Sequence, residues 1–373
     1  MELKPGYKQT EVGVIPDDWQ VVKVGDISQV GRGRVISHRE ISASRYASYP
    51  VYSSQTTNDG TMGYINTYDF EGEYITWTTD GVNAGTVFYR DGRFNCTNVC
   101  GIMKPHSQNA MFLSKVLNTL TSRYVSRNLA NPKLMNDVFK QILVPLPPLP
   151  EQRAIAAAFS DTDALLSSLD RLLAKKRDIK QAVMQQLLTG KQRLPGFSRG
   201  WEVKQLGDVA EIRKGQLITE TDAVDGSVPV IAGGKKPAYF HNKANRNGKT
   251  ITVSGSGANA GYIAFHNRPI FASDCSTISE GTGYSVEFVF YQLQLNQNAI
   301  YKAQIGGAQP HIHPTDLRPI EIGCPSHEEQ TAIADLLSDM DAEIDALQQR
   351  RDKTRAVKQG MMQELLTGRT RLV

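Results

Sequence analysis

Several short motifs in the sequence resemble nucleotide-binding motifs, and each lacks a necessary part. The Gly-Lys-Thr run at 248–250 resembles the end of a phosphate-binding loop, but Lys243 stands where that loop needs its first glycine. The Gly-Ser-Gly run at 255–257 resembles a dinucleotide-binding turn, but the next glycine, Gly261, comes one residue late and no helix of a βαβ unit follows. These glycines therefore predict turns rather than a nucleotide site.

The motifs of catalysis and metal binding fail in the same way. The runs Asn-Pro-Lys at 131–133 and Gln-Pro-His at 309–311 lack the second proline and the aromatic ring of an adenine methyltransferase motif. The Glu-Val-Lys run at 202–204 resembles the end of a nuclease motif, but an earlier copy of the same stretch has Gln-Val-Val there. His311 and His313 alternate as a polar face of an extended segment does, with metal chelation as the alternative. We expect no catalytic residues, no bound metal and no cofactor in this chain.

The composition describes a globular protein. The 373 residues are 40% hydrophobic and 21% charged, with 31 glycines and four cysteines that lack the spacing of a zinc site. A net charge of +4 permits a polyanionic partner without requiring one. No apolar run approaches the roughly 20 residues that span a bilayer. No apolar signal core opens the chain, so we expect a cytoplasmic protein.

An internal duplication organises the elements that would position any site. The run Trp-Gln-Val-Val-Lys-Val-Gly-Asp at 19–26 returns as Trp-Glu-Val-Lys-Gln-Leu-Gly-Asp at 201–208, which is 182 residues later (201 − 19). The Glu-Gln pair at 151–152 returns at 329–330, and Leu-Leu-Thr-Gly at 187–190 returns at 365–368, both 178 residues later (329 − 151 and 365 − 187). Each copy contains a variable body and a better-matched tail.

The bodies are predicted to be mixed and mostly β. Short runs rich in β-branched and aromatic residues lie between clusters of Gly, Asn and Asp, at 73–77, 86–89, 250–253 and 262–265. The runs Gly-Val-Asn-Ala-Gly at 81–85 and Gly-Ala-Asn-Ala-Gly at 257–261 indicate that both bodies share one fold.

Each tail is predicted to be a long helix of about 39 residues, roughly 58 Å at 1.5 Å per residue. Apolar residues alternate spacings of four and three, which is typical of a coiled-coil seam. Ser326 and Glu329 form a capping-box signature, and Gly190 and Gly368 suit the positions just after each helix. The seam residues are Ile155, Phe159, Leu166, Leu169, Leu173, Ile333, Leu337, Met340, Ile344 and Leu347.

This order of bodies and helices resembles the specificity subunits of type I restriction–modification enzymes. The resemblance rests on the run Ile-Pro-Asp-Asp-Trp at 15–19 with Gly25-Asp26, on 146–152, and on the duplicated tails 180–190 and 358–368. It covers essentially the whole chain. The sequence departs from the family pattern at 324–330, where the proline-rich run before the second helix is abbreviated.

The resemblance implies an α+β fold with pseudo-twofold symmetry, in which two target-recognition domains each bind half of a bipartite DNA site. They are expected at 1–148 and 191–324, with antiparallel spacer helices at 149–190 and 325–373. It also implies two methyltransferase subunits that supply S-adenosylmethionine chemistry on adenine, together with restriction subunits. The alternatives are a specificity subunit of a related type IIB-like methyltransferase or nuclease, a self-sufficient enzyme, and a structural coiled-coil adaptor.

Base edges are bound by Asn, Gln, Arg, Lys or Ser side chains, and phosphates by Arg, Lys and backbone amides. For each residue of these types in the loops, a solvated side chain is the alternative to a DNA contact. The candidate DNA-binding residues are Arg32, Arg34, Ser54, Gln55, Thr79, Asn83, Lys133, Lys214, Lys235, Lys236, Ser254, Asn259, Gln309 and His311.

Overall fold

The computed structural model describes residues 4–44, 47–126, 131–306 and 309–372. The chain divides into two compact units, of which unit 1 contains residues 1–168 and 350–373 and unit 2 contains residues 169–349. Each unit therefore combines one body with parts of both tails. Among the described helices, none has the length and apolar character needed to cross a membrane.

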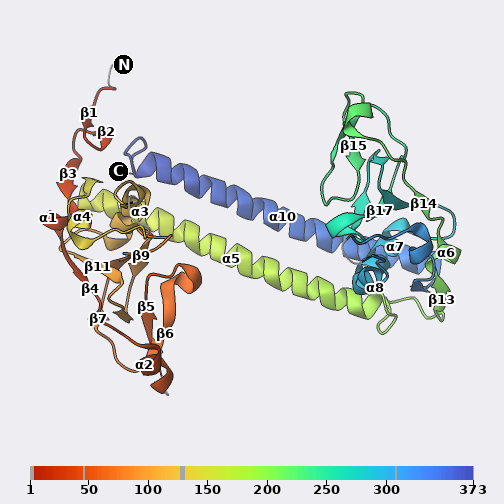
Figure 1. Cartoon of the computed structure of the whole chain (residues 1–373), viewed down its shortest axis with the longest axis horizontal. Coiled ribbons are helices and arrows are strands. Elements are labelled where there is room, and N and C mark those ends of the chain that lie inside the picture. Colours follow the sequence, from red (N-terminus) through yellow and green to blue (C-terminus); the bar gives the residue numbers. More distant parts are fainter. Residues whose placement is uncertain (1–3, 45–46, 127–130, 307–308, 373) are drawn as a thin grey trace. The chain divides into compact units, whose positions relative to one another are not determined.

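The described residues of unit 1 form two four-stranded sheets and two strand pairs, which lie around the start of the helix labelled α5 (Leu149–Leu187) in Figure 1. The first sheet is antiparallel, in the order β4 (Ser28–Arg32), β11 (Cys100–Pro105), β8 (Tyr74–Thr78) and β9 (Val87–Arg90). The second has the order β6 (Thr61–Ile65), β5 (Tyr49–Tyr52), β10 (Arg93–Cys96) and β7 (Phe70–Glu71), with β5 and β10 parallel. The strand pairs are β1 (Tyr7–Thr10) with β2 (Gly13–Pro16), and β3 (Gln20–Lys23) with β12 (Leu143–Leu146).

Two helices of unit 1, at Ala110–Leu120 and Asn136–Lys140, pack on one face of the first sheet, whereas the helix at His38–Ala43 packs against the second sheet. Alternation along β8 points Ile75 and Trp77 into the main core, where the Trp77 ring stacks on Phe139 with centroids 3.7 Å apart. Asn109 caps the helix α3 by accepting a hydrogen bond from the Phe112 amide at 2.8 Å. The helices are α1 (Val24–Ile27), α2 (His38–Ala43), α3 (Ala110–Leu120) and α4 (Asn136–Lys140), with 3-10 turns η1 (Thr57–Gly60) and η2 (Thr121–Arg123).

The described residues of unit 2 repeat this topology, except that the second sheet has three strands and no strand pair matches β1 with β2. Its sheets have the orders β14 (Arg213–Lys214), β20 (Cys275–Ser279), β17 (Thr250–Ser254), β18 (Ile263–His266), and β16 (Tyr239–His241), β15 (Val228–Ile231), β19 (Phe271–Ala272). The pair β13 (Glu202–Gln205) with β21 (Glu321–Cys324) matches β3 with β12. Its helices are α6 (Leu206–Val209), α7 (Val286–Leu295), α8 (Gln297–Lys302) and α9 (Pro314–Leu317), with 3-10 turns η3 (Glu220–Asp222) and η4 (Gly257–Asn259).

Strand registers fix which residues of the two bodies correspond. Arg90 pairs with Tyr74 in unit 1, and His266 pairs with Thr250 in unit 2, so β8 and β9 are equivalent to β17 and β18 with an offset of 176 (250 − 74 and 266 − 90). The parallel pairs β5 with β10 and β15 with β19 also correspond. The four strands expected from the sequence are confirmed to within one residue, and so is the prediction that the bodies share a fold.

The tails form two helices of 39 residues each, α5 (Leu149–Leu187) and α10 (His327–Leu365). Asp163 of α5 pairs with Lys358 of α10 in unit 1. In unit 2, Lys176 and Lys180 of α5 pair with Glu343 and Asp341 of α10 at 2.6 and 2.5 Å. Residue numbers rise along one helix as they fall along the other, so the helices are antiparallel in each unit. The expected α+β class with two repeated domains and two long helices is confirmed.

The helix ends follow their sequence signals with one difference. Gly190 and Gly368 have φ of +68° and +71°, the left-handed conformation expected after a helix. Ser326 accepts a hydrogen bond from the Glu329 amide at 3.4 Å, which is half of a capping box. The Glu329 carboxylate does not complete the box, because it is paired with Arg193 instead.

The candidate seam residues are partly shared with the body cores. Ile155 and Phe159 belong to the main core of unit 1, together with Leu365, the last residue of α10, and Leu366, which follows it. Ile333 and Leu337 pack in unit 2 with Leu187, the last residue of α5, and with Leu188, which follows it. Further along the helices, Leu169, Leu173 and Ile344 are buried, whereas Leu166, Met340 and Leu347 are half-buried.

Candidate nucleic-acid interface

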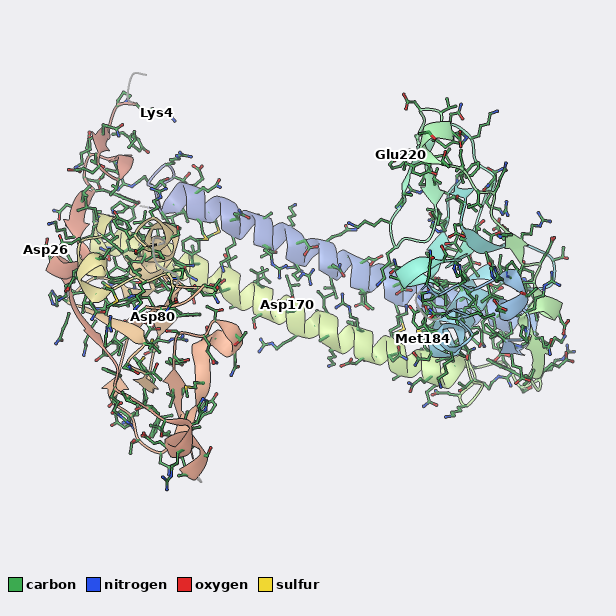
Figure 2. The ribbon with its side chains drawn as sticks, viewed as in Figure 1. Lys4, Asp26, Asp80, Asp170, Met184 and Glu220 are labelled. Carbon is green, nitrogen blue, oxygen red and sulfur yellow. The ribbon has the colours of Figure 1, made fainter. Side chains whose placement is uncertain are left out.

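Four loops of unit 1 come together, and we call residues 53–60, 79–86, 97–99 and 131–134 the first loop cluster. The hydroxyls of Ser54 and Thr79 both donate to the Val99 carbonyl, Thr79 at 2.8 Å. The Asn83 amide donates to the Thr56 hydroxyl at 3.0 Å. Lys133 lies 3.6 Å from Asp80, which is labelled in Figure 2. Through these contacts, four loops that are distant in sequence form one surface.

Unit 2 builds an equivalent surface from residues 232–238, 255–262, 273–274 and 309–312, the second loop cluster. The same backbone hydrogen bond occurs in both clusters. The Gly81 amide donates to the Pro132 carbonyl, and the Gly257 amide donates to the Pro310 carbonyl, both at 3.0 Å. A β-bridge joins Asp80 to Lys133 in the first cluster, and another joins Ser256 to His311 in the second. The two proline-containing runs at 131–133 and 309–311 thus form one edge of each surface.

The structure brings candidate residues to matching positions in the two bodies. Lys133 corresponds to His311 and Asn83 corresponds to Asn259. Lys235 and Lys236 lie in the loop between β15 and β16, equivalent to the loop that holds Ser54 and Gln55. Asn83, Lys235, Lys236 and Gln309 are exposed, whereas Ser54, Gln55, Lys133, Asn259 and His311 are half-buried. These nine residues carry side chains that DNA contacts use.

Five other candidates are placed differently. Thr79 and Ser254 are buried, so their hydroxyls lie below the surface. The Arg34 guanidinium is held by Glu40 at 2.6 Å and Asp69 at 3.1 Å, and the hydrogen bond that it donates to Glu40 raises the pKa of Arg34. Arg32 donates to the Asn136 side chain at 3.3 Å. Arg32 and its equivalent Lys214 are exposed strand residues outside the loop clusters.

Two residues in or beside the second cluster were not predicted from the sequence. Tyr262 lies beneath the Lys235 ammonium, 5.5 Å from ring centroid to Nζ, and Arg268 lies in the turn after β18. A cation in a polar turn next to a predicted strand was the available signal for Arg268. Among the described residues, no cluster of three or more His, Cys, Asp or Glu side chains could hold a metal. His311 and His313 have nearly parallel rings 6.3 Å apart.

Comparisons with known proteins identify the family. The family model described as type I restriction modification DNA specificity domain matches the chain twice, at residues 16–176 and 198–354. A Mycoplasma pneumoniae protein named as a type I specificity subunit is 34% identical over 275 residues, covering 72% of this chain and 68% of that protein. The specificity subunit of the type I restriction enzyme MjaVIII from Methanocaldococcus jannaschii is 24% identical, covering 96% of this chain and 94% of that protein.

A solved structure agrees at the level of the fold. The crystal structure of the S subunit of a type I restriction–modification system from M. genitalium superposes with a TM-score of 0.75 at 15% identity, covering 98% of each chain. Two repeated specificity domains with long connecting helices define a DNA-recognition subunit rather than a catalytic one. The chain belongs to the type I restriction–modification DNA specificity family, and it provides DNA sequence recognition for such a system.

Proposed function

We propose that the two loop clusters each bind one half of a bipartite duplex DNA site. The observation that carries this proposal is the equivalence of the clusters, since the same backbone hydrogen bonds position different side chains in each. A shared scaffold with different side chains at matching positions suits two half-sites of different sequence. The clusters differ mainly at two places. Lys133 of the first cluster stands where the second has His311, and the 53–60 loop stands where the second has the Gly-Gly-Lys-Lys stretch of 232–238.

The partners follow from the family. We propose that two methyltransferase subunits assemble with this chain and supply S-adenosylmethionine chemistry on adenine, and that restriction subunits join them. A similar solved chain comes from work on complex assembly in a type I restriction–modification system. We assign no bound cofactor to this chain, whose role is to orient the DNA for its partners, and we propose that the complex works in the cytoplasm.

Selection from a random duplex library tests this function. The purified full chain, alone and with its methyltransferase partner, should enrich two short conserved blocks separated by a fixed number of unconstrained base pairs. Asn83→Ala should alter only one block and Asn259→Ala only the other, because these equivalent residues lie in different clusters. Enrichment of one continuous block, or a change in both blocks from either variant, would contradict the bipartite assignment. No enrichment in any sample would favour the structural adaptor.

A further inference from the structure

Unit 2 contains a small cavity beside the second loop cluster, with a volume of about 100 Å³. Its walls come from the β17 residues Thr252 and Ser254, the β18 residue His266, and the loop that carries Lys235 and Lys236. Cross-strand pairing of Thr252 with Ala264 places these strand residues on one face of the sheet, which is the face turned away from the main core.

Larger side chains stand at the equivalent place in unit 1. Arg90, equivalent to His266, is buried with its guanidinium carbon 3.6 Å from the ring centroid of Tyr52 and 4.5 Å from that of Phe88. Registers make Ile231 the equivalent of Tyr52 and Ala264 the equivalent of Phe88. Three smaller side chains in unit 2 therefore open the cavity.

The positive charge is neutralised by a neighbouring carboxylate in unit 1 but not at the cavity of unit 2. In unit 1, Arg90 donates to the Asp59 carboxylate at 2.6 Å and to the Thr76 hydroxyl at 3.1 Å, so its charge is matched inside the protein. The cavity of unit 2 is lined by three cationic side chains, Lys235, Lys236 and Arg268, and none of the described residues that line it carries a carboxylate. Converging cations without a protein counter-charge attract an anion.

The cavity wall also holds a buried hydroxyl that lacks a partner. Ser254 is 3% exposed, and its Oγ makes no hydrogen bond with any described residue. A buried polar atom without a partner is unfavourable, and such atoms are rare in folded proteins. The hydroxyl lines a cavity bordered by cations, which points to a ligand that accepts hydrogen bonds.

His266 is a neutral hydrogen-bonding group in this wall. Burial, with a smaller effect from Arg268, lowers the pKa of His266 to about 4. Its Nε2 lies 3.0 Å from the Thr252 hydroxyl. The imidazole therefore adds no charge at neutral pH, and its titration reports on any anion that enters the cavity.

We propose that this cavity binds a phosphate group, with Lys235, Lys236 and Arg268 balancing its charge and the Ser254 hydroxyl donating to one of its oxygens. The proposal deepens the proposed function and rests on it, because the cavity adjoins the second loop cluster and a DNA backbone phosphate is the expected source. The first body has no such site, since Arg90 and Asp59 occupy it. The two bodies then hold the DNA backbone differently.

Titration of the full chain with inorganic phosphate tests the site directly. The His266 ring signal in NMR, identified by its loss in His266→Asn, should shift in a saturable way as phosphate is added. The pKa of His266 should rise by at least about one unit, because a nearby anion favours the imidazolium. A His266 signal that ignores phosphate would overturn the proposal and leave bipartite DNA selection untouched.

Matched variants separate the cavity from general surface charge. Lys235→Gln with Lys236→Gln should weaken phosphate binding at least about tenfold, because two charge-assisted contacts are lost. Lys191→Gln with Lys243→Gln removes the same charge from exposed positions outside the cavity and should change little. Ala264→Phe keeps every cation but fills the space as Phe88 does in unit 1, and it should abolish binding. Equal weakening by both lysine pairs, or full binding in folded Ala264→Phe, would contradict a built site.

Adding duplex DNA distinguishes the two sources of phosphate. If the occupant is a backbone phosphate, DNA without added phosphate should shift the His266 signal, and it should compete with inorganic phosphate. If inorganic phosphate binds and DNA neither shifts the signal nor competes, the site is for a free phosphate compound and the DNA source is wrong. Failure of the proposed function would appear separately, as loss of sequence selection with the phosphate response intact.

Discussion

Two buried carboxylates explain the repeated Glu-Gln pairs. Glu151 is fully buried and accepts from Arg371 at 2.6 and 2.8 Å and from the Trp19 indole at 3.0 Å. Glu329 accepts from Arg193 at 2.5 Å through both oxygens, and Arg193 stands 178 residues before Arg371 (371 − 193). Each glutamate thus joins the start of one long helix to the segment that follows the other. The duplicated glutamates therefore have a structural role.

Replacing Arg371 tests this role in unit 1. Arg371→Met leaves Glu151 buried without its cation and should cost about 2 kcal/mol, below the range for a fully buried pair because Arg371 is 28% exposed. The double variant with Glu151→Met should recover much of that loss. Hydrogen exchange of unit 1 peptides measures the change. Arg213→Met, whose partner Glu211 is exposed, is the control and should alter unit 2 little.

Acid should weaken the contact between α5 and α10 in unit 1, because this contact depends on the Asp163 carboxylate. Burial raises the pKa of Asp163, but hydrogen bonds from Lys358 and Lys115 outweigh it, so the pKa lies below its ordinary value of 3.8. A carboxylate whose pKa is lower in the folded than in the unfolded state stabilises the fold at pH values above its unfolded-state pKa. This stabilisation is lost as the pH falls through its folded-state pKa. We expect unit 1 to lose stability below about pH 4.

Asp163→Asn should lower the stability of unit 1 at neutral pH and flatten its dependence on acid, as unfolding at a series of pH values would measure. Asp161→Asn, an exposed carboxylate on the same helix, is the matched control and should leave the acid profile unchanged. An unaltered acid profile in Asp163→Asn would show that other carboxylates control this range.

Individual contact residues were the hardest features to derive from the sequence. Residue type and loop position selected Arg34, but Asp69, which is 35 residues away in sequence (69 − 34), holds its guanidinium. Thr79 was selected for its hydroxyl, which the structure shows to be buried and bonded to Val99. A pattern of residue types cannot reveal which polar groups the fold pairs internally. Equivalence between the bodies would have been a better guide, because Lys133 and His311 occupy matching positions.

At the scale of elements, the periodicity of apolar residues was sufficient to predict both long helices and four of the strands. Apolar residues spaced four and three apart predicted both long helices, and runs of β-branched and aromatic residues predicted β8, β9, β17 and β18. Each pattern predicts its element because it reflects burial of one face of that element. The sequence did not show that Ile155 and Phe159 would be shared between the seam and a body core. That outcome depends on where α3 packs, which is a tertiary contact.

Charged residues in the seam should separate assembly from the folding of the bodies. Leu166 and Ile344 are equivalent positions, and Ile344 is 8% exposed. Leu166→Asp with Ile344→Asp should cost several kcal/mol in helix pairing, because an unpaired carboxylate is placed in an apolar surface. Both bodies should stay folded on their own cores while selection of a bipartite site is lost.

The control for this variant pair lies on the exposed side of the same helices. Ser168→Asp with Ala346→Asp adds the same charges at exposed equivalent positions and should preserve bipartite selection. Melting of both bodies in the seam variant, seen as loss of hydrogen-exchange protection in β8 and β17, would contradict separate cores. Intact bipartite selection would contradict the role of the seam.

At the scale of the whole molecule, each unit is completed by the other half of the chain. Unit 1 takes Lys358, Leu365, Leu366 and Arg371 from the second tail. The first tail carries the same residue types 178 positions earlier, at 180, 187, 188 and 193. A fragment of residues 1–195 therefore contains both sides of every one of these contacts. We expect it to form a symmetric homodimer in which each copy completes the other.

Light scattering of this fragment measures the association state, and selection with the methyltransferase partner should yield a palindromic two-part site. Arg193→Met in the fragment should weaken the dimer, because Arg193 would take the place of Arg371 beside Glu151. A folded monomer at the concentrations used for assembly would show that the tail contacts do not complete the unit.

The long helices should set the spacing between the two half-sites. One heptad inserted after Leu169 and another after the equivalent Leu347 keep the apolar seam in register and lengthen each helix by about 10 Å. At about 3.4 Å per base pair along DNA, this is at most about three base pairs. The conserved blocks should stay the same, since neither loop cluster is altered, while the gap between them grows by one to about three base pairs. Three base pairs also rotate one half-site by nearly a third of a turn about the DNA axis, so activity alone is a poor measure. Sequencing of selected or methylated sites gives the gap directly. An active variant that keeps the original gap would show that the helices do not determine it.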